Sequence, residues 1–150
     1  MINLYSKHSI IMQKSTQNIY ESHHQERRDE SFSILEKERG LLFKQKIGEG
    51  KKIVDLGCRN GVLTKHYIQN NDVLGVDIDT NSLEKAKDLG IKTVHMDLNG
   101  NWSELDKQKF DIAVLAETLE HLYNPEKVIE KVKALLRKDG IFIGSVPNAF

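Results

Sequence analysis

The chain has 150 residues, which is enough for one domain with a buried core. Its 22 basic and 22 acidic side chains cancel to a formal net charge of zero, which argues against a general electrostatic attraction to nucleic acid or to an acidic membrane. Its apolar runs are strand-sized and interrupted by charges, so no membrane-spanning helix is expected. Cys58 is the only cysteine, which rules out an internal disulfide and indicates a reducing, cytoplasmic compartment.

The N-terminal part of the chain carries little structural signal. Residues 1–26 are polar and lack clear periodicity, so they are expected to form a flexible arm or a partial cap. Residues 27–150 are expected to form the domain itself. It should begin with an imperfect helix over residues 27–47, because apolar residues recur there at roughly helical spacing: Phe32, Leu35, Leu42, Phe43 and Ile47.

After a break at residues 48–52, strand and helix patterns alternate. Strands are predicted over residues 52–57, 72–78, 91–97, 110–116 and 141–146. Helices are predicted over residues 60–71, 79–90 and 124–140. Apolar strands joined to helices by short connections predict an α/β fold, with a Rossmann-like, doubly wound, mostly parallel sheet flanked by helices.

The three helices that follow the first strand show apolar faces and end signals. The residues expected to face the sheet are Val62, Leu63, His66 and Tyr67; Leu83, Ala86 and Leu89; and Val128, Ile129, Val132, Leu135 and Leu136. Asp79 or Thr80 is expected to cap the second of these helices. The third is expected to continue to Gly140, with Arg137 and Lys138 complementing its C-terminal dipole.

Acidic residues stand where the predicted strands end. Asp55 lies at the end of the first strand, Asp77 at the end of the second and Asp97 at the end of the third. In parallel α/β sheets ligands bind outside the carboxyl ends of the strands, near the point where the strand order reverses. Gly57 and Gly61 follow Asp55, and they permit a tight turn and close approach of a ligand to the backbone.

A nicotinamide dinucleotide would require the pattern G-x-G-x-x-G in this loop. Read from Gly57, that pattern needs glycine at Arg59 and a small residue at Val62, and the sequence has neither. The phosphate-binding loop with its lysine and Ser/Thr is missing as well. A nicotinamide oxidoreductase is therefore disfavoured.

Five segments in a fixed order carry a stronger signal: VDLGCRNG at 54–61, GVDID at 75–79, HMDLN at 95–99, FDIAVLAETLEHL at 110–122 and GIFIGSVPN at 140–148. Their order and spacing resemble class I S-adenosylmethionine-dependent methyltransferases of the type 11/12 kind, with some similarity to ubiquinone-type O-methyltransferases and MetW-like proteins. The resemblance implies methyl transfer from S-adenosylmethionine to an oxygen, nitrogen or carbon nucleophile of a small molecule or biosynthetic intermediate, with release of S-adenosylhomocysteine.

The resemblance also implies a cofactor site at the strand ends. Asp77 would accept hydrogen bonds from both ribose hydroxyls, while Asp97 would accept one from the adenine amine. Asp55 and the loop after it would face the methionyl group. The expected cofactor-binding residues are Asp55, Gly57, Cys58, Gly61, Asp77, Ile78, Asp97, Leu98 and Ala116. Simpler roles remain open: Asp55 can cap the next helix, Cys58 can be a small buried filler, and Asp97 can form a turn.

Glu117, Glu120 and His121 follow the fourth strand, where the methyl group and the acceptor should meet. On one helical turn all three side chains can converge. One interpretation is a divalent-metal site, since the E-x-x-E-H pattern is similar to small-RNA 2′-O-methyltransferases, which use a further histidine downstream. The favoured interpretation is an acceptor pocket without a metal, in which His121 and Glu117 are the expected catalytic residues and His121 is the candidate general base.

The sheet of the resembled family usually ends in an antiparallel hairpin of two further strands, which this sequence does not reach. Residues 27–150 are therefore expected to form a C-terminally incomplete domain lacking that hairpin. The expected partner is a small-molecule acceptor, without nucleic acid or membrane, and a homodimer or a partner protein stays open. The alternative function is a non-catalytic module that binds S-adenosylmethionine and regulates a partner enzyme.

Overall fold

The structure is a computed structural model and describes residues 36–147 of the chain. The arm expected over residues 1–26 and the first part of the helix expected over residues 27–47 lie outside the described residues. The remainder of that helix is α2 (Glu36–Ile47).

Five parallel strands form the sheet of the described part, in the order β3-β2-β1-β4-β5. They are β1 (Lys52–Leu56), β2 (Asp72–Asp77), β3 (Lys92–His95), β4 (Phe110–Ala116) and β5 (Leu136–Ser145). The other helices are η1 (Thr64–His66), α3 (Thr80–Asp88), η2 (Leu119–His121) and α4 (Pro125–Leu135). The first strand, β1, lies in the middle of the sheet. β2 and β3 follow on one side of it and β4 and β5 on the other, so the strand order reverses between β1 and β4. The expected doubly wound α/β fold is confirmed.

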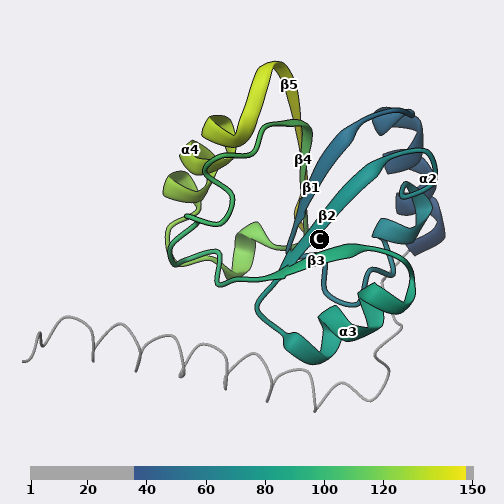
Figure 1. The fold of residues 1–150 in the computed structure, drawn as a ribbon, viewed down its shortest axis with the longest axis horizontal. Helices are drawn as coiled ribbons and strands as arrows, with labels where there is room; N and C mark the ends of the chain where they lie inside the picture. The colour runs from purple at the N-terminus through teal and green to yellow at the C-terminus, as the bar shows by residue number, and fades with distance from the viewer. Residues whose placement is uncertain (1–35, 148–150) are drawn as a thin grey trace, which may run out of the picture. The chain divides into compact units, whose positions relative to one another are not determined.

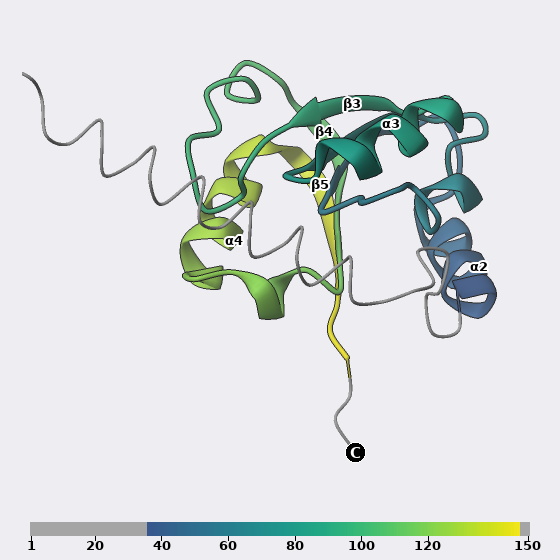
Figure 2. The same cartoon turned by 90° about the horizontal axis from the view of Figure 1, so that it is seen from below.

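Helices cover both faces of the sheet, with α4 on one face and α2 and α3 on the other (Figure 1). The view from below shows the same separation (Figure 2). Successive strand residues point to opposite faces. Val54 and Leu56 accordingly share one buried cluster with residues of α4, whereas Ile53 packs with Phe43 and Ile47 of α2. By the same alternation Asp55 belongs to the face covered by α2.

Two leucines of the predicted helices are exposed, and for Leu89, which was expected to face the sheet, the prediction is wrong. In α2, Phe43 and Ile47 are buried but Leu42 is 50% exposed. Adjacent residues on a helix lie 100° apart, so Leu42 cannot share the narrow face that Phe43 occupies. In α3, Leu83 and Ala86 are buried, whereas Leu89 is 41% exposed. Leu89 is the C-cap residue, one position past the last residue of α3, and so has left the buried face.

The helix predicted over residues 60–71 is largely wrong, because the structure has only the 3-10 turn η1 there. Thr64 and Tyr67 are buried, whereas Val62, Leu63 and His66 are only half-buried. The hydroxyls of Thr64 and Tyr67 both donate to Asp55. These two side-chain contacts fix the segment against β1, so tertiary hydrogen bonds replace a regular helical repeat.

The last helix is shorter and the last strand longer than predicted. α4 ends at Leu135, and Leu136 is already extended and pairs with Phe110 of β4. Arg137 pairs with Asp111 of β4 instead of lying at the helix end. The helix end expected at Gly140 is therefore wrong. The residues after Leu135 pair with β4 instead of continuing the helix. Between Phe110 and Ile112 the register shifts, so that β5 has more residues than β4 over this stretch.

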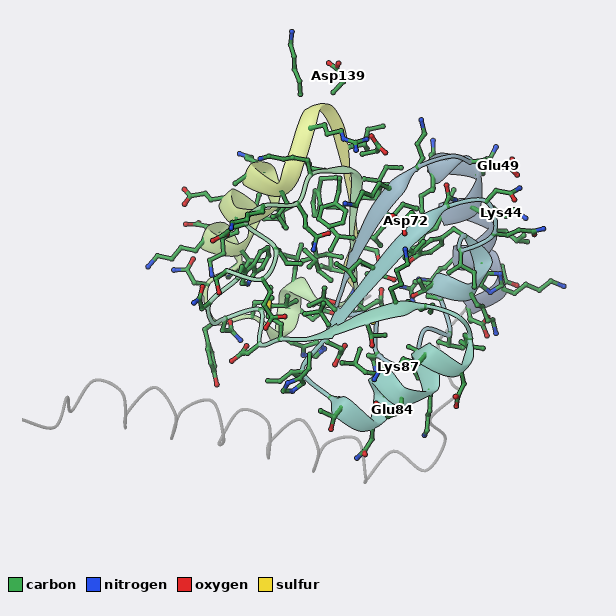
Figure 3. The ribbon with its side chains drawn as sticks, in the orientation of Figure 1. Lys44, Glu49, Asp72, Glu84, Lys87 and Asp139 are labelled. Carbon is green, nitrogen blue, oxygen red and sulfur yellow. The ribbon has the colours of Figure 1, made fainter. Side chains whose placement is uncertain are left out.

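Charged side chains lie mainly at the periphery of the described part. Figure 3 shows Lys44, Glu49, Glu84 and Asp139 pointing outward from it. Glu84 and Lys87 form an exposed pair at 2.7 Å, and such pairs contribute little to stability. Among residues 36–147, no helix has the length and apolar composition needed to cross a bilayer.

Two glycines with similar positive φ angles provide a matched test of packing. Gly61 has φ +73°, and a methyl group there would lie 2.4 Å from Ile91 Cδ1. Gly90 has φ +84° and no heavy atom within 4 Å of that position. Both alanine variants should lose about 1–2 kcal/mol of unfolding free energy from left-handed strain. Gly61→Ala should lose about 1–3 kcal/mol more through overpacking, as measured by urea unfolding. Equal losses would show that the Ile91 contact relaxes freely.

Candidate functional site

The loop from Gly57 to Gly61, called the glycine loop below, leaves the carboxyl end of β1 and is tied to β2. The N–H groups of Gly57 and Cys58 both donate to the Val76 carbonyl, at 2.7 and 3.1 Å. Gly57 has φ +84°, and a Cβ there would lie 2.3 Å from Thr118 Oγ1. Packing between the loop and the segment after β4 therefore requires glycine at this position. This packing contact adds to the tight turn and the ligand approach that the sequence indicates for Gly57.

Arg59 takes the backbone conformation that a glycine would adopt with less strain. Its φ is +49°, in the left-handed region. Its N–H donates to Asp77 Oδ2 at 2.8 Å, and the residue as a whole is exposed. The hydrogen bond to Asp77 thus holds a non-glycine residue in this conformation, and the loop closes without the third glycine of the dinucleotide pattern.

Asp77 lies buried at the carboxyl end of β2 and holds the loop from that side. Besides the N–H of Arg59, its carboxylate accepts the N–H of Asp79 at 2.9 Å. Burial raises the pKa of Asp77, while these two backbone donors oppose the rise. A carboxylate can accept about four hydrogen bonds, so Asp77 keeps capacity for two more.

Asp55 is the second buried carboxylate, and it holds the loop from its base. The hydroxyls of Thr64 and Tyr67 donate to the same oxygen, Oδ2, at 2.5 and 2.6 Å. Burial raises the pKa of Asp55 to about 6, and the charge of Asp77 adds to the rise, while the two hydroxyls oppose it. Asp55 thus holds the η1 segment through side-chain hydroxyls and not as a conventional helix cap.

The predicted cofactor-binding residues after β2 and β3 differ in burial and in hydrogen bonding. Asp97 Oδ1 accepts the N–H of Asn99 at 2.8 Å and its Nδ2 at 3.2 Å, so the turn role left open for Asp97 is present. Leu98 is buried in the core, and its carbonyl accepts the indole N–H of Trp102 at 3.0 Å. Ile78 is half-buried next to Asp77.

Glu117 follows β4 in a left-handed conformation with φ +54°. Its N–H donates to the Ser145 carbonyl at 2.9 Å, and its carboxylate lies 3.2 Å from the guanidinium of Arg39 in α2. Arg39 also donates to Ser145 Oγ at 3.2 Å, across 106 sequence positions. Arg39 could not be predicted from the sequence, because no local motif marks a contact of such long range. Ala116, just before Glu117, is half-buried.

The convergence of Glu117, Glu120 and His121 that one helical turn would permit is not present. The three residues do not share one helical turn, because Glu117 precedes η2 and its carboxylate is directed to Arg39. His121 is exposed, with Nε2 4.0 Å from Glu120 Oε1. Within residues 36–147, no three His, Cys, Asp or Glu side chains are grouped so as to hold a metal ion.

A cavity of about 640 Å³ lies at the opposite end of the sheet. Its lining includes Asp72 and Lys92, the first residues of β2 and β3. The acids and the glycine loop lie at the last residues of the strands. The candidate site is therefore identified by its side chains and by the topology, because this cavity lies away from both.

Comparison with known proteins agrees with this topology. Residues 47–149 match the family described as a methyltransferase domain. The chain belongs to the methyltransferase-domain family. The family and the fold expected from the sequence, those of class I S-adenosylmethionine-dependent methyltransferases, are confirmed.

Individual relatives of the methyltransferase domain support the same assignment. The ubiquinone biosynthesis O-methyltransferase of Haemophilus ducreyi is 37% identical over 109 residues, which are 66% of this chain and 46% of that protein. The chain thus spans about half the length of this relative. The structure of an S-adenosylmethionine-dependent methyltransferase from Mesorhizobium loti has a TM-score of 0.60 and 27% identity, over 65% of this chain and 47% of that one. Coclaurine N-methyltransferase, bound to N-methylheliamine and SAH, has a TM-score of 0.65 at 24% identity, over 73% of this chain and 35% of that one, and shows the fold alone.

The raised pKa of Asp55 predicts a pH dependence of stability. Because the folded-state pKa is about 6 against an ordinary value of 3.8, ionisation of Asp55 is disfavoured in the folded state. Its contribution is therefore most favourable below about pH 4 and falls by about 3 kcal/mol as the pH rises through about 6.

Asp55→Asn should remove this contribution. Urea unfolding between pH 4 and pH 7.5 should show the stability of the wild type falling relative to the variant as the pH rises. Both proteins carry the same other titrating groups, including Glu36 and Asp111, so the difference reports Asp55 together with its coupling to Asp77. Parallel curves for the two proteins would contradict the raised pKa.

Proposed function

We propose that the chain is the cofactor-binding part of a methyltransferase that acts on a small molecule or biosynthetic intermediate. It transfers the methyl group of S-adenosylmethionine to an oxygen, nitrogen or carbon nucleophile and releases S-adenosylhomocysteine. The observation that carries this proposal is the pair of buried carboxylates, Asp55 and Asp77, that hold a glycine loop at the carboxyl edge of a 3-2-1-4-5 sheet. Oxygen is the favoured acceptor atom, because the relative from Haemophilus ducreyi carries the name of an O-methyltransferase.

The chemistry of this edge suits S-adenosylmethionine. Asp77 retains acceptor capacity for the two ribose hydroxyls, and Ile78 adds apolar surface beside it. The acids are compatible with a sulfonium cation, which a basic pocket would repel. When bound, S-adenosylmethionine supplies an electrophilic methyl group on its sulfur. The residues proposed to bind it are Asp55, Gly57, Cys58, Gly61, Asp77, Ile78, Asp97, Leu98 and Ala116.

The acceptor side is proposed to lie after β4. His121 is exposed on η2 and takes the proton from an acceptor hydroxyl as general base. Glu117 lines the same side, where its pairing with Arg39 orients the turn that leads into η2. Placing the acceptor in line with the sulfur supplies much of the rate enhancement, because orientation removes an entropic barrier.

The setting of the reaction is also part of the proposal. We place the protein in the cytoplasm, on the support of its single cysteine, whose thiol is buried. The balanced charge supports a small molecule and not nucleic acid as the acceptor.

Calorimetric titration with S-adenosylmethionine and S-adenosylhomocysteine, followed by a methyl-transfer assay on hydroxyl, amine and carbon acceptors, tests the function. Binding with turnover on one acceptor class is the expected result. Tight binding without turnover on any acceptor would favour the regulatory module instead. Failure to bind either ligand would contradict both functions.

Asp77→Ala should weaken the binding of S-adenosylhomocysteine by about 2–3 kcal/mol, because it removes charge-assisted hydrogen bonds to the ribose. Asp72→Ala is the matched control, since Asp72 is an exposed acid at the other end of the same strand. Titration calorimetry measures both affinities, and urea unfolding checks that the variant remains folded. An unchanged affinity in a folded Asp77→Ala variant would place the ribose elsewhere.

His121→Ala should leave the affinity for S-adenosylhomocysteine nearly unchanged and lower turnover by about 100-fold or more, as expected for a lost general base. Glu120→Gln is a neighbouring control that should retain most of the turnover. Single-turnover rates with a saturating hydroxyl acceptor give the comparison. If the two variants had equal rates, His121 would have no role as a base.

A further inference from the structure

Thr64 and Tyr67 form a buried cluster with Asp55 beneath the glycine loop. The three residues are 0%, 1% and 3% exposed, respectively. Both hydroxyls converge on one carboxylate oxygen, Asp55 Oδ2, at 2.5 and 2.6 Å. Charge-assisted hydrogen bonds of this length are among the stronger ones in proteins. The cluster therefore fixes the Asp55 carboxylate in one orientation.

The cluster joins the two ends of the glycine loop. Asp55 lies two residues before Gly57, whereas Thr64 and Tyr67 lie after Gly61. Along the loop, the N–H of Gly61 donates to the Cys58 carbonyl at 3.0 Å and the N–H of Lys65 donates to the Gly61 carbonyl at 2.9 Å. The two hydroxyls thus link the residue before the loop to the segment after it, and the two backbone hydrogen bonds fix the loop between them.

Neither hydroxyl-bearing side chain is placed to touch a ligand. The Tyr67 ring packs edge-on against Phe43 of α2, with centroids 6.3 Å apart and the planes at 70°. Thr64 has no exposed surface. Any effect of these hydroxyls on a ligand must therefore pass through Asp55 and the loop.

We propose that Thr64 and Tyr67 are positioning residues of the cofactor site, whose hydroxyls hold the Asp55 carboxylate and the glycine loop in the geometry that binds the nucleoside cofactor. The inference rests on the proposed function, because it assigns these residues a role at the same site. It predicts that removing either hydroxyl weakens cofactor binding even though the residue makes no contact with the ligand.

The charges around Asp55 decide how the test works. Asp77, from β2, disfavours ionisation of Asp55, and the hydroxyls of Thr64 and Tyr67 favour it. The nearby Cys58 thiol stays neutral, because burial and both acids raise its pKa. Removing a hydroxyl therefore raises the pKa of Asp55 further.

The experiment uses the 150-residue chain and four variants. Tyr67→Phe and Thr64→Val remove a hydroxyl with little change in shape, while Thr64→Ser keeps the hydroxyl. Thr93→Val, in the middle of β3, is the control for a threonine outside the cluster. Carbon-13 NMR of labelled aspartate carboxyls follows the titration of Asp55, which Asp55→Asn identifies. Calorimetry measures S-adenosylhomocysteine affinity from pH 5 to pH 8.

For Tyr67→Phe and Thr64→Val we expect the Asp55 midpoint to rise by about one pH unit. The pH at which S-adenosylhomocysteine affinity reaches half its maximum should rise equally, because binding uses the carboxylate form. Thr64→Ser and Thr93→Val should match the wild type. An unmoved Asp55 midpoint in folded variants would overturn the inference, and so would unchanged affinity at every pH. Loss of binding by the wild type itself would instead refute the proposed function, while the NMR midpoint would still report on the cluster.

Discussion

Two buried carboxylates hold the glycine loop, and the candidate site depends on how their charges are tolerated. Asp55 and Asp77 lie on neighbouring strands, where burial disfavours ionisation of both; the charge of Asp77 adds to this effect at Asp55, and the charge of Asp79 adds to it at Asp77. Hydroxyl donors stabilise the first and backbone N–H donors the second. All of these donors come from the loop, from η1 and the residue that follows it, or from the β2–α3 connection. Each buried carboxylate needs hydrogen-bond donors in place of water, and the loop conformation supplies those donors.

Helix α2 connects the segments on the two sides of the strand-order reversal. Glu36 lies 2.6 Å from His66 Nε2 and 3.0 Å from Lys65 Nζ, after β1, and these partners lower its pKa. Arg39, one helical turn later, lies 3.2 Å from Glu117, after β4. The first turns of α2 thus fix the η1 segment and the Glu117 turn relative to each other. These contacts relate the proposed cofactor side to the proposed acceptor side through a single helix.

Much of the fold follows from local patterns, while the site geometry does not. β4 was predicted with its observed bounds, because its continuous apolar run and flanking charges leave little choice. The 60–71 segment failed, because its conformation depends on hydroxyl bonds to a residue in β1 that helical periodicity cannot reveal. The predicted end of α4 was wrong for a similar reason: residues 136–138 favour a helix by their intrinsic propensity, but they lie in β5, which pairs with β4. Asp55 and Asp77 could be placed at the sheet edge from the sequence, but Arg39 could not, because its partners lie far along the chain.

The close approach of Gly57 to Thr118 has a mechanical consequence. Since a single added carbon at Gly57 would overlap the Thr118 side chain, the two segments touch with no intervening space. The loop that follows β1 cannot shift toward β4 unless Thr118, and with it the entry into η2, moves as well. The relative position of the proposed cofactor and acceptor sides is therefore set by a direct contact between Gly57 and the Thr118 side chain. It does not depend on the conformation of the many residues that separate these two segments in the chain. The missing side chain of Gly57 thus sets the distance between the glycine loop and the segment after β4.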